Sequence, residues 1–126
     1  MWTFDKLFIA GEWRAPRSRT LAEVVNPATE EVVGKVAQAT REDVDQAVRS
    51  ARAALTGWKL TPAAERGRIM LRIANLMDEH SEELAEMIIS GLGSPAARTR
   101  QYMVGFPANT IRFYAKLLID GTHASV

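Results

Sequence analysis

The chain has 126 residues, of which 47% are hydrophobic and 25% are charged, a composition typical of a folded domain with one modest core. Sixteen basic and fifteen acidic residues give a formal net charge of +1, which does not favour nucleic acid as a partner. Cysteine is absent, so these residues supply no thiol nucleophile, disulfide or thiolate metal ligand.

The two histidines, His80 and His123, are far apart and lack the spacing of metal ligands, so we expect no metal site. No apolar run approaches the length of about 20 residues that spans a bilayer. The first residues also lack the basic and then apolar regions of a signal peptide. We therefore expect a cytoplasmic protein without a membrane segment.

The first third of the chain has the pattern of short strands. Residues 7–9 and 12–13 surround Ala10 and Gly11 and predict a hairpin. A loop with Arg14, Arg17 and Arg19 follows, which we interpret as solvated, a phosphate-binding patch being the alternative. Residues 21–25 and 32–36 then predict two strands joined by a turn over residues 26–29.

The period changes at Thr40, which can cap a helix together with Asp43 as the acidic arm of a capping box. Apolar residues then recur at three and four residues and form one narrow, alanine-rich face, comprising Val44, Ala47, Val48, Ala51, Ala54 and Leu55. We expect Gly57 to end this helix and Trp58 to anchor the following turn.

A second helix is predicted from Thr61 and Pro62 onward. Its apolar stripe consists of Ile69, Ile73, Leu76 and Met77. We expect a break or bend at residues 78–81, with Ser81 capping a further helix.

That further helix is expected to stop at Gly91-x-Gly93, and Ser94 and Pro95 to begin the next one, with a side-chain oxygen as the cap. Residues 96–119 form a long pattern that is apolar around much of its circumference. Pro107 lies inside it, and an interior proline costs about 3 kcal/mol, so we expect a kink or two helices.

The residues by themselves indicate no catalytic site. Gly91 and Gly93 follow a helix and fit a helix end better than a phosphate-binding loop. The acidic side chains of the third helix are expected to be solvated surface, not paired acid and base, namely Glu82, Glu83 and Glu86. An aromatic stripe is expected to belong to the core, a pocket lining being the alternative, and it comprises Tyr102, Phe106 and Tyr114.

Several strings in their order nonetheless resemble the amino-terminal part of the NAD(P)-dependent aldehyde dehydrogenase superfamily. They are Leu7-Phe8-Ile9-Ala10-Gly11-Glu12-Trp13, Val25-Asn26-Pro27-Ala28-Thr29, Glu42-Asp43-Val44-Asp45-Gln46-Ala47-Val48, Arg66-Gly67-Arg68-Ile69, Gly93-Ser94-Pro95 and Arg112-Phe113-Tyr114-Ala115. Each string alone is a weak indication of the family. Together they occur in the family's order and cover nearly the whole chain.

The resemblance implies an α+β fragment, mainly helical, in which N-terminal β-hairpins precede three long helices at the start of the cofactor-binding domain. It implies a single incomplete domain, with a hairpin region at residues 1–39 and a helical region at 40–121. The family oxidises an aldehyde through a cysteine thiohemiacetal, passes hydride to NAD or NADP, and hydrolyses the thioester with a glutamate-activated water. None of that machinery is expected in this chain, so we predict no catalytic, cofactor-binding or metal residue here. Tyr102 and Phe106 resemble residues that face the substrate entrance.

Three positions depart from the family pattern. Glu30 replaces the glycine that usually follows Asn-Pro-Ala-Thr, where a left-handed turn would suit glycine. Pro107 interrupts a helix that is continuous in the family. Gly91 replaces an acidic residue that helps bind a structural cation in many relatives, so we do not expect that cation.

We therefore expect a truncated aldehyde dehydrogenase that is inactive alone, the alternative being a non-catalytic helical interaction module. In the complete family a sheet supplied later in the chain covers the apolar stripes of these helices. Without that sheet the stripes would expose a large apolar surface, and burying such a surface contributes roughly 25 cal/mol per Å². This favours a homo-oligomer through residues 69–87 and 111–118, or association with a full-length relative, a self-closing bundle being the alternative.

Overall fold

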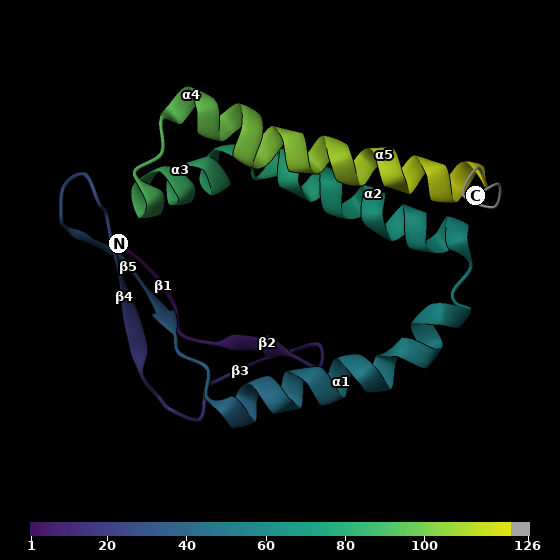
Figure 1. The fold of residues 1–126 in the computed structure, drawn as a ribbon, viewed down its shortest axis with the longest axis horizontal. Helices are drawn as coiled ribbons and strands as arrows, with labels where there is room; N and C mark the ends of the chain where they lie inside the picture. The colour runs from purple at the N-terminus through teal and green to yellow at the C-terminus, as the bar shows by residue number, and fades with distance from the viewer. Residues whose placement is uncertain (122–126) are drawn as a thin grey trace. The chain divides into compact units, whose positions relative to one another are not determined.

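The computed structural model describes residues 1–121, whose contacts divide into two compact units, Met1–Lys59 and the residues from Leu60 onward (Figure 1). The first unit contains the strands and one helix, and the second contains only helices. The predicted order of hairpins followed by helices is confirmed. Among residues 1–121, no helix combines the length and apolar character that crossing a membrane requires.

The first unit has five strands and the helix α1. They are β1 (Trp2–Phe4), β2 (Leu7–Ile9), β3 (Glu12–Arg14), β4 (Leu21–Val25), β5 (Val32–Ala37) and α1 (Arg41–Leu60). Strands β2 and β3 form the predicted hairpin, in which Phe8 pairs with Trp13 and their ring centroids lie 5.1 Å apart. The two turn residues, Ala10 at φ 58° and Gly11 at φ 82°, are both left-handed, as the right-handed twist of a two-residue hairpin requires.

The strand β1 has no counterpart in the sequence-based prediction. It pairs in parallel with β5, so that Trp2 lies opposite Gly34 in a three-stranded sheet of order β1-β5-β4. A Cβ at Gly34 would lie 2.3 Å from the Trp2 ring. The indole therefore needs a residue without a side chain beneath it, which explains the glycine within a strand.

Strands β4 and β5 form the second predicted hairpin, with an irregular register between Val24 and Val25. In the connecting turn the Asn26 side-chain oxygen accepts a hydrogen bond from the Ala28 N–H at 2.9 Å. Glu30 has φ 61°, so the position that resembles a family glycine does adopt the left-handed conformation, and here a glutamate carries it.

The helix α1 begins with the predicted capping box. The Asp43 N–H donates to the Thr40 hydroxyl at 3.3 Å, and the Thr40 N–H donates to the Asp43 carboxylate at 2.9 Å. The prediction that Gly57 ends this helix is wrong, because α1 continues to Leu60 and carries Trp58 within it. Glycine inside a helix lowers its stability without ending it when flanking residues such as Leu55 favour helix.

The second unit consists of α2 (Ala63–Glu79), α3 (Ser81–Leu92), α4 (Ala96–Arg98), the π-helix η1 (Thr99–Gly105) and α5 (Phe106–Asp120). The predicted break after α2 is confirmed, but the capping residue is His80 and not Ser81, which is already the first residue of α3. Gly93 ends α3 in the left-handed conformation at φ 64°, as predicted.

Helices α2 and α5 lie side by side and run in opposite directions (Figure 1). The buried residues of their interface are small, namely Gly67, Ala74, Ala108 and Ala115. Arg112 on α5 donates to Asp78 at 2.5 Å and to Asn75 at 3.4 Å, both on α2. The pair is thus held by close backbone approach and by one polar bridge.

The chain passes Pro107 without leaving its helical path. The turn before it widens into η1, where the Phe106 N–H donates to the Gln101 carbonyl five residues back, and Pro107 falls in the first turn of α5. A wider turn relieves the contact between the proline ring and the preceding carbonyls. The sequence predicted a kink or two helices at Pro107, and the structure has a π-helix before it, followed by α5.

Candidate functional site

The aromatic side chains of the last helical stretch lie at the surface. Tyr102 is 58% exposed and Phe106 is 64% exposed, so the expectation that the aromatic stripe belongs to the core is wrong. The positions that are buried here belong to smaller residues, Thr99, Val104 and Ala108. Periodicity located an apolar helix correctly, but the wider turns of η1 changed which positions face inward.

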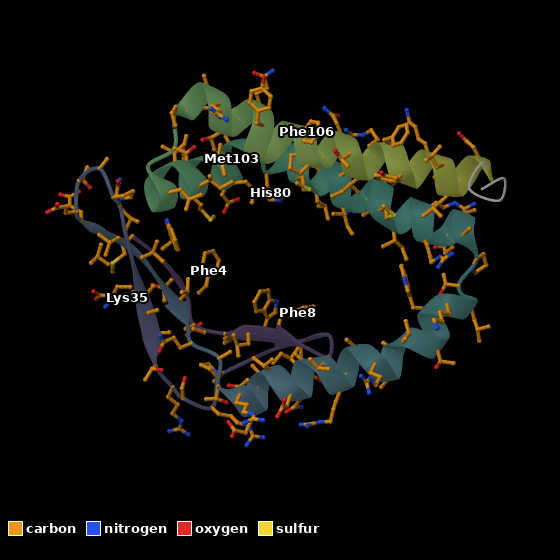
Figure 2. The ribbon with its side chains drawn as sticks, viewed as in Figure 1. Phe4, Phe8, Lys35, His80, Met103 and Phe106 are labelled. Carbon is orange, nitrogen blue, oxygen red and sulfur yellow. The ribbon has the colours of Figure 1, made fainter. Side chains whose placement is uncertain are left out.

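Two adjoining grooves follow this exposed surface. A groove of about 450 Å³ is lined by Ala97, Arg98, Gln101 and Tyr102. A second groove of about 320 Å³ is lined by Gln101, Tyr102, Gly105, Phe106 and Asn109. The structure thus brings Tyr102 and Phe106 to the same groove, which Gln101 and Tyr102 connect to the first one. Figure 2 shows Phe106 at the start of α5, where this surface lies.

The polar groups of the grooves are mostly hydrogen-bond donors. The Asn109 side-chain oxygen already accepts a hydrogen bond from Arg112 at 3.0 Å, which leaves its amide N–H groups to donate. No carboxylate is among the lining residues of either groove. Arg100 is bound to Glu82 through two hydrogen bonds of 3.0 and 3.1 Å. Within residues 1–121, by contrast, Arg98 forms no ion pair.

The start of this stretch is held by Thr99, whose buried hydroxyl donates to the Pro95 carbonyl at 3.0 Å. The prediction that a side-chain oxygen caps the helix is wrong, because Pro95 occupies the cap position and no side chain bonds there. The Ser94 hydroxyl lies 3.5 Å from the Met103 sulfur instead. Ser94 therefore tethers the loop to η1 and does not cap the helix.

The two carboxylates with shifted pKa values belong to the start of α1. The pKa of Asp43 is lowered chiefly by the hydrogen bond from the Thr40 backbone, and further by the N–H of Arg17 at 3.1 Å. The pKa of Glu42 is lowered by its own backbone N–H and by the Thr40 side chain. Hydrogen bonds to the ionised form explain both directions, and the arrangement is that of a helix cap.

The acidic residues of α3 form no catalytic pair. Glu82 binds Arg100, and a carboxylate oxygen of Glu83 lies 3.1 Å from His80 Nδ1, with all of these side chains exposed. Over residues 1–121, no group of three or more histidine, cysteine or acidic side chains is placed to hold a metal ion. His123 lies outside the described residues.

The stretch Gly91-x-Gly93 does not fit a dinucleotide-binding loop. Gly93 caps the end of α3, whereas a pyrophosphate-binding loop must follow a strand and open a helix. Gly91 lies inside α3 and offers no carboxylate to a cation. Gly91 and Gly93 therefore do not form such a loop.

A further groove of about 630 Å³ lies in the first unit, where no sequence pattern indicated one. It separates the β2–β3 hairpin from the small residues of α1, among them Ala47, Ala51 and Ala54. The ring of Phe8 stands off β2 and is 60% exposed (Figure 2). The alanine-rich face was visible in the sequence, but its partner across the groove depends on the path of the loop between β3 and β4.

The profile of the Aldehyde dehydrogenase family matches residues 13–125. The chain belongs to this family. Malonate-semialdehyde dehydrogenase 1 of Geobacillus kaustophilus is 44% identical over 91 residues, which are 72% of this chain and 19% of that protein. An aldehyde dehydrogenase C mutant from Pseudomonas syringae, solved with NAD⁺ and octanal, is 42% identical with a TM-score of 0.85, covering 90% of this chain and 24% of that one. HpcC from Thermus thermophilus is 35% identical with a TM-score of 0.87, and the match covers 93% of this chain and 22% of that one.

This aldehyde dehydrogenase chain spans about a fifth to a quarter of the length of the relatives it matches. It corresponds to their N-terminal part, at the start of the NAD-binding domain, which confirms the resemblance and the fold expected from it. The alternative of a non-catalytic helical interaction module is not favoured.

Proposed function

We propose that this chain supplies the N-terminal part of an enzyme that oxidises an aldehyde to a carboxylate and transfers hydride to NAD or NADP. The observation that carries this proposal is the match of residues 13–125 to the family, together with the TM-score of 0.85 to a relative solved with NAD⁺ and octanal. Because the chain has no cysteine, the thiol nucleophile of the family reaction belongs to residues outside it. We expect the chain alone to be inactive.

Within that enzyme we assign Tyr102 and Phe106 to the substrate entrance. Their exposure and their shared groove support this assignment, since an entrance residue must be accessible before the aldehyde reaches the reacting atoms. The relatives are named for different aldehydes, such as malonate semialdehyde and benzaldehyde, so their names do not select one substrate.

Complementation between two polypeptides tests the proposal. The catalytic part of aldehyde dehydrogenase C from Pseudomonas syringae, without the segment that matches this chain, is produced alone and together with this chain. NADH formation is measured with octanal. We expect neither polypeptide alone to turn over and the pair to be active.

The controls separate folding from function. Phe106→Ala in the complemented enzyme should change KM for octanal more than kcat, because an entrance residue contacts substrate before the chemical step. Turnover by this chain alone would contradict the proposal, and so would an inactive pair whose two polypeptides co-purify in folded form.

The proposal includes a partner, which is a second copy of this chain. Several large apolar side chains on α2 and α5 remain at least 37% exposed, namely Ile69, Ile73, Leu76, Phe113 and Tyr114. They fall in the two segments from which a homo-oligomer is expected, residues 69–87 and 111–118. An exposed apolar surface of this kind favours association, and a full-length relative is the competing partner.

Light scattering over a range of protein concentrations tests the association. We expect a dimer or larger assembly, and Phe113→Glu should shift it toward monomer, whereas Arg49→Glu, at an exposed position outside both segments, should not. A monomer at all concentrations would contradict the homo-oligomer. A cytoplasmic location is also part of the proposal, and fractionation of cells that express the tagged chain tests it.

A further inference from the structure

The two grooves beside Tyr102 carry a charge that the aromatic residues do not explain. Arg98 lines the groove of about 450 Å³ and is exposed, and across residues 1–121 no carboxylate pairs with it. The nearby Arg100 is neutralised by Glu82 at 3.0 Å. The groove therefore keeps one guanidinium that is free to bind an anion.

The remaining lining groups are suited to the same ligand. Gln101 contributes an amide to both grooves, and Asn109, whose side-chain oxygen accepts a hydrogen bond from Arg112, lines the second groove. Tyr102 adds a hydroxyl. With the Arg98 guanidinium, the first groove therefore offers several donors and no carboxylate, and an anion with several oxygens suits such a set.

The protein also offers a surface that can contact the apolar part of a ligand. Tyr102 and Phe106 are 58% and 64% exposed and line the groove of about 320 Å³. Arg98 and Tyr102 are four residues apart and line one groove, so a carboxylate bound by Arg98 places the adjoining carbons over the rings.

We propose that Arg98 makes this entrance surface selective for aldehydes that carry a carboxylate. The guanidinium binds the carboxylate, Gln101 in the same groove donates to its oxygens, and Tyr102 and Phe106 contact the hydrocarbon between the carboxylate and the aldehyde. Arg98 is a specificity-determining residue in this scheme and takes no part in the chemical step. The inference rests on the proposed function, because it assumes that Tyr102 and Phe106 face the substrate.

Binding to the chain tests the inference without requiring catalysis. Phenylpropionate and phenylpropanol share one skeleton and differ in the carboxylate, and neither is oxidised as an aldehyde. Each is titrated into the labelled chain while the amide resonances of residues 97–109 are followed. We expect phenylpropionate to bind more tightly and its affinity to fall with added salt.

Three variants complete the design. Arg98→Gln should weaken phenylpropionate binding about fivefold and leave phenylpropanol unchanged, as expected for one partly exposed ion pair. Arg98→Lys should retain most of the preference. Arg72→Gln removes a charge from another exposed position, on α2, and should change the binding of neither ligand.

Equal binding of the two ligands, or equal weakening of both by Arg98→Gln, would overturn the inference. Either result would leave the complementation experiment untouched, since that experiment uses octanal, which has no carboxylate. Conversely, an inactive complemented pair with a strong carboxylate preference in the chain would overturn the proposed function and keep Arg98 as an anion site.

Discussion

Gly67 on α2 lies directly against the backbone of α5 at Ala115. A Cβ added to Gly67 would be 2.7 Å from the Ala115 carbonyl oxygen and 2.7 Å from a side-chain carbon of Ile119. A backbone carbonyl cannot rotate away as a flexible side chain can, so the two helices would have to separate. This contact accounts for a glycine in the first half of a long helix, where propensity disfavours it.

Gly67→Ala should therefore destabilise the chain by about 1–2 kcal/mol, although alanine favours helix. The matched control is Gly57→Ala in α1, where a new Cβ would meet nothing within 4 Å. That substitution should stabilise by about 0.5–1 kcal/mol. Urea unfolding followed by circular dichroism measures both, and a stabilising effect at Gly67 would contradict the close approach of α2 and α5.

The polar bridge between the same helices gives a second prediction. Arg112 binds Asp78 and Asn75 across the α2–α5 interface and is the less exposed partner, at 25% of its side chain. Arg112→Leu should lower the free energy of unfolding by about 1 kcal/mol, because it removes a charge-assisted pair between two helices.

The control for this variant is Arg68→Leu, which removes the pair with Glu65 within α2. A local pair of this kind is worth about 0.2–0.5 kcal/mol. Equal effects of the two substitutions on the denaturation midpoint would show that the bridge adds nothing beyond a local ion pair.

Local patterns predicted most of the elements of this chain. The β2–β3 hairpin depends on Ala10 and Gly11 and the capping box on Thr40 and Asp43, and each is decided by residues within a few positions of one another. The strings that resemble the aldehyde dehydrogenases also occur in order, so the family could be inferred before the fold was known.

Features that depend on distant residues could not be predicted in this way. The strand β1 pairs with β5, where Trp2 lies over Gly34, and nothing near Trp2 in the sequence indicates that partner. The exposed placement of Tyr102 and Phe106 depends on the π-helix before Pro107, which shifts the inward-facing positions. The helix end expected at Gly57 was wrong because one glycine does not outweigh the helix formers around it.

Glu30 carries a third prediction. It adopts φ 61° in the turn between β4 and β5, a conformation that costs a residue with a side chain about 1 kcal/mol or more and costs glycine little. Glu30→Gly should therefore raise the stability of the chain by up to about 1 kcal/mol. Thermal unfolding of the two proteins measures the change.

Glu31→Gly is the matched control for that turn. Glu31 is exposed and does not have a positive φ, so glycine there only increases the freedom of the unfolded chain. It should lower stability. Changes in stability of opposite sign for Glu30→Gly and Glu31→Gly identify backbone strain at Glu30. Changes of the same sign would indicate that only the loss of charge matters.

The environment of Asp43 predicts how the stability of the chain depends on pH. Its carboxylate is almost fully buried and accepts hydrogen bonds from the backbone N–H groups of Thr40 and Arg17, which lower its pKa. The folded state therefore binds the proton less readily than the unfolded state, whose pKa is near 3.9. The stabilisation is present above that value and is lost as the pH falls through the folded pKa.

Asp43→Asn should lower the denaturation midpoint at neutral pH and reduce the loss of stability between about pH 5 and pH 2. Asp45→Asn is the control, because it removes the same charge from an exposed position of the same turn. Denaturation midpoints of the two variants and of the unsubstituted chain are measured across this pH range. If both variants keep the full acid dependence of the unsubstituted chain, the hydrogen bonds of Asp43 do not govern its acid stability.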